Sequence, residues 1–225
     1  MINDTVRTDI PFLRPSDDLD EAEQIIEDAR LGGLPVVDDG KLTGSILERD
    51  LDAYREMLES KPNHQLSSLI LPAPVTLPAG LHPYEAMKLF SKIPQRFIPV
   101  ADKDATYAGL VLFEDVMTKV GKMLSADSEG VVIEMEVPAH QFRMSDLIRL
   151  IEQNDARVLN VASRLTESGE GQQITMKLQT LEPFRLQRTL ERYSYVITYI
   201  SHSDESALLD DTQHKAQEFI RYLEV

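Results

Sequence analysis

The sequence contains no cysteine among its 225 residues. This absence excludes disulfide bonds, thiolate metal sites and cysteine nucleophiles, so we expect no redox chemistry from the chain itself. No apolar run approaches the roughly 20 residues that a membrane-spanning helix needs. The first residues also lack the charged and then apolar pattern of a signal peptide. We therefore expect a cytoplasmic protein without a membrane partner.

Basic residues are scarce relative to acidic ones. The chain carries 23 Lys and Arg against 38 Asp and Glu, which gives a formal net charge of −15. Such a charge repels the phosphate backbone of nucleic acids and disfavours them as partners. A small nucleotide is still compatible with it, because one phosphate needs only a local cluster of donors. With 42% hydrophobic and 27% charged residues, the composition is that of a globular protein of one or two domains.

Familiar catalytic and metal-binding motifs are missing as well. The sequence has no phosphate-binding loop, no dinucleotide-binding turn and no nucleophile elbow. An acidic group at 17–21 fits the first turn of a helix better than a magnesium site. Five histidines fall in separate segments, and none has a second ligand at helical spacing: His64, His82, His140, His202 and His214. We predict a protein with no catalytic residue, metal or cofactor, and rate an enzyme with an unfamiliar site as the weakest alternative.

The first half of the chain contains an internal repeat. The run Leu34–Asp38 is echoed 64 residues later by Ile98–Asp102, with a proline at the second position of each. Two further pairs recur 65 residues apart, namely Gly44 with Gly109 and Asp50 with Asp115. One extra residue therefore sits in the second turn, where loops tolerate insertions.

Periodicity predicts the order β-α-β-β-α within each repeat. In the first copy, apolar residues at helical spacing predict a helix that Gly32 and Gly33 end, followed by strands at 34–37 and 42–47. A second helix follows with Leu51, Tyr54 and Leu58 on one face. The second copy repeats this order with a helix to Phe90, strands at 97–101 and 107–112, and a helix at about 114–124.

The run Leu-Pro-Val-Val-Asp-Asp-Gly-Lys-Leu-x-Gly, with an acidic residue six positions after its last glycine, resembles a CBS domain. Two such repeats in tandem resemble a CBS pair, or Bateman module, over 5–124, with repeat 1 at about 5–62 and repeat 2 at about 68–124. The resemblance implies sheets packed around a pseudo-twofold axis. It also implies two clefts that often hold adenine nucleotides or related adenosyl ligands such as S-adenosylmethionine.

The resemblance assigns a ribose-contacting carboxylate to Asp50 and Asp115. Such a carboxylate can accept hydrogen bonds from both ribose hydroxyls. The hydroxyl that helps hold phosphate in the family is replaced by Leu47 and Leu112, neither of which can donate a hydrogen bond. A second interpretation of both carboxylates stays open, in which each is simply a helix N-cap.

The segments before the apolar strands supply the remaining candidate ligand-binding residues. By the same resemblance, Gly33, Leu34 and Phe97 are expected to offer backbone groups to the clefts. Arg30 and Arg96 are the candidate phosphate contacts, although solvated surface positions are the simpler explanation of both arginines.

A second domain is expected after the polar linker 125–130. Alternating apolar residues and helical spacing predict the order β-α-β-β-α-β over 130–202, which is ferredoxin-like. After a CBS pair, this order resembles the ACT domain of acetoin-utilisation-type CBS proteins. The loop 138–143 lacks the Asp and Gly of amino-acid-binding ACT domains, so this domain is expected mainly to pair subunits. The residues 203–225 predict a C-terminal amphipathic helix.

The fold class expected overall is mixed α/β (α+β), with tandem CBS repeats, an ACT-like domain and a terminal helix. The leading hypothesis is a ligand-sensing homodimer in which an adenosyl compound alters the packing of the second domain and thereby an unknown regulated protein. The alternative is a structural or interaction module whose clefts are filled by side chains and bind no small molecule.

Overall fold

The computed structural model describes residues 2–59, 65–69, 71–78, 80–138, 142–167 and 169–201. The chain forms two compact units, Met1–Val120 and Gly121–Val225. The predicted C-terminal helix and the histidine at position 140 lie outside the described residues. Within those residues, every helix is too short or too polar to cross a membrane.

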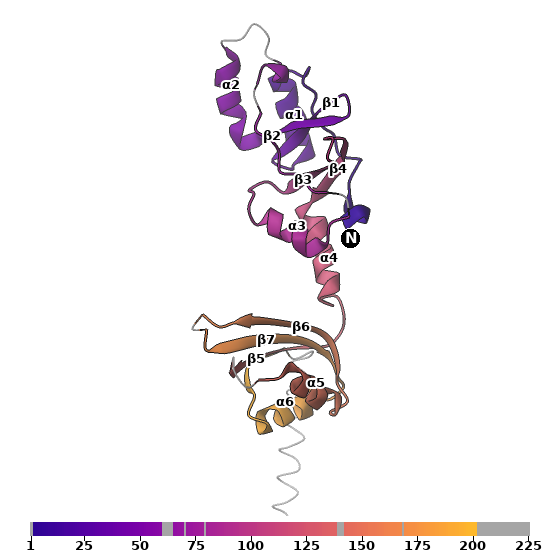
Figure 1. Cartoon of the computed structure of the whole chain (residues 1–225), viewed down its shortest axis with the longest axis vertical. Helices are drawn as coiled ribbons and strands as arrows, with labels where there is room; N and C mark the ends of the chain where they lie inside the picture. Colours follow the sequence, from indigo (N-terminus) through magenta and orange to yellow (C-terminus); the bar gives the residue numbers. More distant parts are fainter. Residues whose placement is uncertain are drawn as a thin grey trace, which may run out of the picture. The chain divides into compact units, whose positions relative to one another are not determined.

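The first unit consists of two β-hairpins, each with a helix before it and a helix after it (Figure 1). The first copy contains α1 (Leu19–Ala29), β1 (Gly33–Asp38), β2 (Lys41–Leu47) and α2 (Leu51–Glu59). The second contains α3 (Pro83–Phe90), β3 (Phe97–Ala101), β4 (Tyr107–Leu112) and α4 (Phe113–Met123). Short 3-10 turns occupy η1 (Ile2–Thr5), η2 (Glu48–Asp50) and η3 (Leu66–Ser68).

The first strand predicted for each repeat is reduced to a single bridge. Leu13 forms a parallel bridge with Val36, and Leu77 forms the equivalent bridge with Val100. Prolines flank both leucines, at 11 and 15 in the first copy and at 74 and 78 in the second. Because proline has no N–H to donate, the flanking prolines oppose the extension of either ladder beyond its single bridge.

Helix α1 ends earlier than predicted. Asp18 caps its start by accepting a hydrogen bond from the backbone N–H of Asp20 at 3.0 Å. At its other end Arg30 takes the left-handed conformation, with φ at 54°, so the prediction that glycines end this helix is wrong. A short loop follows, and Gly33 is the first residue of β1.

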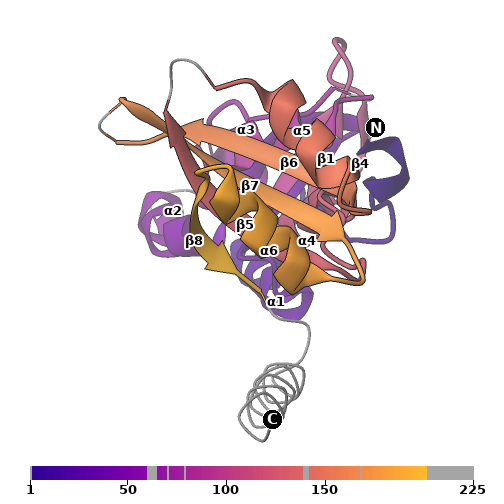
Figure 2. The same cartoon turned by 90° about the horizontal axis from the view of Figure 1, so that it is seen from below.

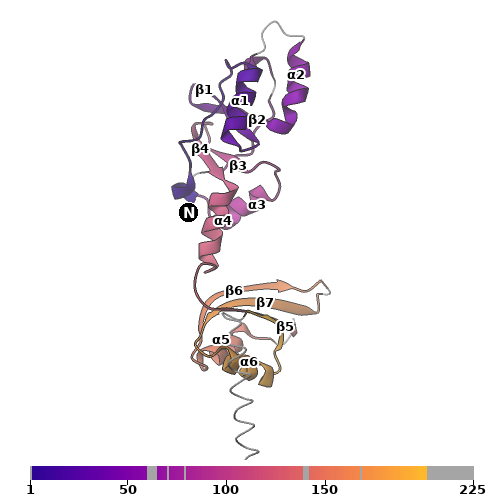
Figure 3. The ribbon, with the colours of Figure 1, turned by 180° about the vertical axis from the view of Figure 1, so that it is seen from behind.

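The core of the first repeat lies between its hairpin and its two helices, which are seen side by side from both directions (Figures 1 and 3). Helix α1 buries Leu19, Ala22 and Ile26 there, and α2 buries Leu51 and Leu58. On the outside, the guanidinium of Arg55 joins the helices by pairing with the carboxylates of Asp20 and Glu23.

The two hairpins of the first unit meet at their turns. The N–H of Leu42 donates to the carbonyl of Ala105, and the N–H of Tyr107 donates to that of Gly40, both at 2.8 Å. Val37, Leu42 and Ala101 form a small buried cluster against which Tyr107 packs. The Tyr107 hydroxyl has no solvent exposure and no hydrogen-bond partner in the described part of the chain, and burial raises its pKa to about 12.

We expect Tyr107→Phe to keep or raise stability, by up to about 1 kcal/mol, because it removes a buried hydroxyl that makes no hydrogen bond. In the wild type the folded state holds this proton more tightly than the unfolded chain. Stability is therefore lost as pH rises from about 10 through about 12. Urea unfolding against pH should show this loss, and Tyr107→Phe should reduce it, leaving the part that comes from the raised pKa values of Tyr54 and Tyr195. Tyr84→Phe gives the matched control, because it removes the same hydroxyl from an exposed side chain.

The described part of the second unit is a four-stranded sheet with α5 and α6 on one face (Figure 2). Its elements are β5 (Val131–Pro138), α5 (Met144–Glu152), β6 (Arg157–Leu165), β7 (Gly171–Gln179), α6 (Pro183–Arg192) and β8 (Val196–Ile200). The strands lie in the order β6-β7-β5-β8 and all neighbours are antiparallel. Alternate residues of β5 and β7 are buried beneath the helices, as the period-two pattern requires.

Candidate functional site

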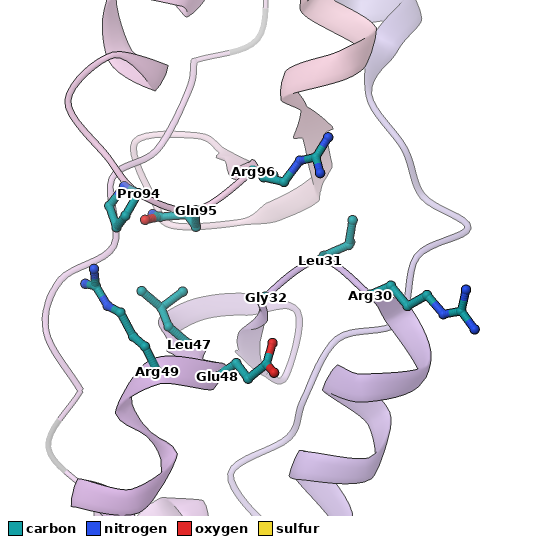
Figure 4. Close-up of a pocket in the computed structure, with 9 residues that line it drawn as sticks. All are labelled: Arg30, Leu31, Gly32, Leu47, Glu48, Arg49, Pro94, Gln95 and Arg96. Carbon is teal, nitrogen blue, oxygen red and sulfur yellow. The ribbon is translucent and has the colours of Figure 1, made fainter.

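A cleft of about 520 Å³ lies in the first unit where the starts of β1 and β3 meet (Figure 4). Three short segments line it: the end of α1 with its loop, the residues after β2, and the loop before β3. The lining residues are Arg30, Leu31, Gly32, Leu47, Glu48, Arg49, Pro94, Gln95 and Arg96. Both repeats therefore contribute to one cavity.

Equivalent backbone hydrogen bonds shape the two sides of this cleft. The N–H of Glu48 donates to the carbonyl of Gly32 at 3.1 Å. In the second repeat, the N–H of Phe113 donates to the carbonyl of Arg96 at 2.8 Å. Each bond ties the residue after the returning strand to the residue before the first strand. The loop before each hairpin is thereby fixed in place.

The side chains of the cleft differ in where they point (Figure 4). Those of Leu47 and Glu48 extend into the space between the repeats, and that of Arg49 rises beside Pro94. The guanidinium of Arg30 is directed away from the other lining residues. The cleft thus presents an apolar group and one carboxylate at its centre, with cations around it.

Two of the lining arginines are already paired with carboxylates. Arg96 pairs with Glu114, which is at the start of α4. The Nε of Arg49 lies 3.5 Å from Oδ1 of Asp50. Both pairs are largely solvent-exposed, so each contributes little to stability and can be exchanged for a ligand at low cost.

The structure places the predicted site residues in two different ways. Arg30 and Arg96 are both among the residues that line the cleft. The side chains of Leu34 and Phe97 are completely buried in the core, so they can offer a ligand only backbone groups. Gly33 begins β1 opposite Leu47, directly beside the cleft loop.

Asp50 directly follows three cleft-lining residues, being the last residue of η2 before α2 begins. Its side chain is 39% exposed and therefore accessible to a ligand. Burial, and after it the negative charge of Asp50, raises the pKa of Tyr54. Glu48 and Arg49, which lie between Leu47 and Asp50 and line the cleft, were not among the predicted site residues.

Asp115 has a different environment from Asp50. It is the third residue of α4, inside the helix rather than at the predicted N-cap position. Its Oδ2 atom has no solvent exposure and no hydrogen-bond partner among the described residues. The nearest cation is Arg7, whose Nη1 lies 3.7 Å away. Nothing in the sequence pattern around Arg7 pointed to this contact.

Arg7 is held chiefly by Asp9. Its Nε and Nη2 donate to the two carboxylate oxygens of Asp9 at 2.9 and 2.8 Å. Hydrogen bonding to Arg7 lowers the pKa of Asp9 to about 2. Hydrogen bonding to Asp9 in turn raises the pKa of Arg7, with a smaller contribution from Asp115.

These residues suit the binding of a small polar ligand. Across the described ranges, no three histidine, aspartate or glutamate side chains gather into a group that could hold a metal ion. The ring of His82 has a structural role, because its Nδ1 accepts a hydrogen bond from the N–H of Tyr84 and caps α3. What the cleft offers is cations, backbone groups and an accessible carboxylate.

Comparisons with known proteins identify the first half of the chain. The CBS domain family matches residues 2–56. The uncharacterised protein YlbB of Bacillus subtilis is 31% identical over 137 residues, which cover 57% of this chain and 92% of YlbB. Inosine-5'-monophosphate dehydrogenase of Thermoplasma acidophilum is 27% identical over 123 residues, or 54% of this chain. The chain spans only about a quarter of that enzyme's length, at 24%.

A similar solved structure is that of CBSX2 from Arabidopsis thaliana, determined in complex with AMP. It is 22% identical, has a TM-score of 0.48 and covers 54% of this chain and 96% of its own. The prediction of a CBS pair is thereby confirmed on the family match and on the extent of the similarity to YlbB. The chain belongs to the CBS domain family.

Proposed function

We propose that the first unit binds an adenosine-containing ligand, such as AMP, ADP, ATP or S-adenosylmethionine, in the cleft between its repeats and acts as a regulatory module. The observation that carries this proposal is the cleft with Arg30, Arg49 and Arg96 in its lining and the exposed carboxylate of Asp50 at its edge. CBS domain proteins are regulatory. The volume of the cleft, about 520 Å³, lies within the range of about 300 to 1,000 Å³ typical of small-molecule sites.

Charge in the lining favours an anionic ligand. The guanidinium of Arg30 points away, but the other charged lining residues, Arg49, Arg96 and Glu48, still give the cleft a positive formal charge although the whole chain carries −15. Arginine presents a planar fork of donors that matches a phosphate group in two places. We propose that the ribose binds Asp50 and that the phosphates exchange places with the carboxylates now paired with the arginines.

Thermal unfolding in the presence of ATP, ADP, AMP and S-adenosylmethionine tests the proposal. A ligand that binds only the folded state stabilises it by about 2.7 kcal/mol at hundredfold excess over its Kd. We therefore expect at least one of the four to raise the melting temperature by about 5 °C or more. If all four leave it unchanged at millimolar concentration, the adenosyl ligand is ruled out.

A second candidate function is that of a structural module without a ligand. Leu47 points into the cleft where a phosphate-holding hydroxyl would stand, and the carboxylate of Glu48 repels phosphate. Replacing Glu48 separates the two candidate functions. Glu48→Gln should strengthen nucleotide binding severalfold if the cleft is a ligand site, and should have no such effect if it is only a packed interface.

For the second unit we propose an ACT-like domain that responds to the ligand and pairs two chains in a homodimer. Its β-α-β-β-α-β order, its strand order and the placement of both helices on one face support this assignment. Hydrogen–deuterium exchange over residues 131–200 should change when ligand is added, and light scattering should give twice the mass of one chain. Unchanged exchange would contradict the coupling, and a monomeric mass would contradict the pairing.

A further inference from the structure

The two carboxylates that the repeats place at equivalent positions are not equally accessible. Asp50 is 39% exposed, and its near cation is its sequence neighbour Arg49. The Asp115 side chain as a whole is 31% exposed, but its Oδ2 atom has no exposure and lies 3.7 Å from Nη1 of Arg7, a residue 108 positions earlier in the chain. The two carboxylates therefore differ in one oxygen, which in Asp115 is closed to a ligand and lies beside Arg7.

The N-terminal segment is firmly attached to the second repeat. Arg7 and Leu110 exchange two backbone hydrogen bonds, at 2.7 and 3.0 Å. The approach is so close that a Cβ added at Gly109 would lie 2.5 Å from the carbonyl oxygen of Arg7. Further toward the N-terminus, the carboxylate of Asp4 pairs with the ammonium of Lys119. Arg7 is thus positioned by backbone contacts, while Asp9 orients its guanidinium.

In the first repeat, the residue that comes close to the equivalent glycine is not a cation. There, the close neighbour of Gly44 is the side chain of Leu71, which would lie 2.7 Å from an added Cβ. Leucine has no charge with which to hold a carboxylate. The two sites differ because the residue close to Gly109 is Arg7 and the residue close to Gly44 is Leu71.

We propose that Arg7 blocks the Asp115 carboxylate, so that the chain takes up one adenosine-containing ligand, at Asp50, and a second at Asp115 only when Arg7 is displaced. This inference rests on the proposed function. A ribose needs both carboxylate oxygens to accept its two hydroxyl hydrogens, and one oxygen of Asp115 is inaccessible behind the ion pair. Arg7 is then the residue that sets how many ligands bind.

Isothermal titration calorimetry on the full chain, with each of the four compounds named above, tests this inference. We expect one ligand per chain for the wild type and two for Arg7→Ala. The double variant Arg7→Ala, Asp115→Ala should return to one. Arg55→Ala is the matched control and should stay at one, because it removes an equally exposed arginine from carboxylates outside the clefts.

A second variant guards against a local folding defect in Arg7→Ala. Asp9→Asn loosens the guanidinium while leaving Arg7 and Asp115 in place, and should strengthen the second binding event at least tenfold relative to wild type. Circular dichroism without ligand should give both variants the wild-type spectrum, because the backbone hydrogen bonds of Arg7 do not depend on either side chain.

The outcomes separate this inference from the proposed function. Two ligands on the wild type, one on Arg7→Ala, or loss of binding in Arg7→Ala would each overturn the role of Arg7 while leaving an adenosyl site intact. Binding to Arg7→Ala alone would support the blocking of Asp115 and contradict the site at Asp50. No binding to any variant would overturn the proposed function and the inference with it.

Discussion

In Asp50→Ala, the rise in melting temperature caused by the adenosine-containing ligand is expected to fall to about half or less of the wild-type rise at the same ligand concentration. The variant removes the accessible carboxylate at the edge of the cleft, which is 39% exposed and adjoins the lining residue Arg49. Hydrogen bonds to a charged group contribute about 1.5 to 3 kcal/mol. The Kd should therefore increase by a factor of about 10 to 150, measured by calorimetry at constant salt.

Asp52→Ala provides the control for this loss. Asp52 lies two residues further on, in the first turn of α2, and is exposed away from any described cavity lining. Asp52→Ala removes the same charge as Asp50→Ala, so any effect of the protein's net charge on ligand binding appears in both variants. Equal weakening by the two variants would show that Asp50 acts through net charge and not through contact with the ribose.

Replacing Gly33 with alanine is expected to destabilise the first unit by about 2 to 4 kcal/mol. Its φ is +149°, which side chains rarely adopt, and an added Cβ would lie 2.4 Å from the carbonyl oxygen of Ile46. The obstacle is backbone in the paired strand, so it cannot move without breaking the hairpin. Urea unfolding followed by hydrogen–deuterium exchange of the first unit measures the loss.

Gly40→Ala separates backbone strain from this steric clash. Gly40 also has a positive φ, of +76°, but no atom lies within 4 Å of an added Cβ there. We expect it to cost only about 1 to 2 kcal/mol, from the left-handed conformation alone. If both glycine variants lower the free energy of unfolding equally, the close packing of Gly33 against β2 does not contribute to it.

The sequence predicted the features that depend on residues close together in the chain. The repeat of Leu34–Asp38 at 98–102 falls on strands β1 and β3, because both apolar runs are buried in hairpins. Leu47, which the family resemblance places at the phosphate-holding position, lies in the cleft lining. Local patterns carry this information, since hydrophobic period and turn residues act over a few positions.

The features that the sequence did not predict have non-local or competing causes. The contact of Arg7 with Asp115 joins segments far apart and follows no periodicity. The single bridge at Leu13 reflects flanking prolines that outweigh the apolar strand pattern. Arg30 ends α1 in a conformation usually taken by glycine, because its N–H still reaches the carbonyls of Ile26 and Glu27.

The most direct test of the central claim is a crystal structure of the full chain grown with the compound that raises the melting temperature most. The ligand is expected in the cleft lined by Arg30, Arg49 and Arg96, with its ribose hydroxyls within about 2.6 to 3.2 Å of the Asp50 carboxylate. Asp115 should remain paired with Arg7 at low ligand concentration. An empty cleft, or the ligand bound elsewhere on the chain, would contradict the proposed regulatory site.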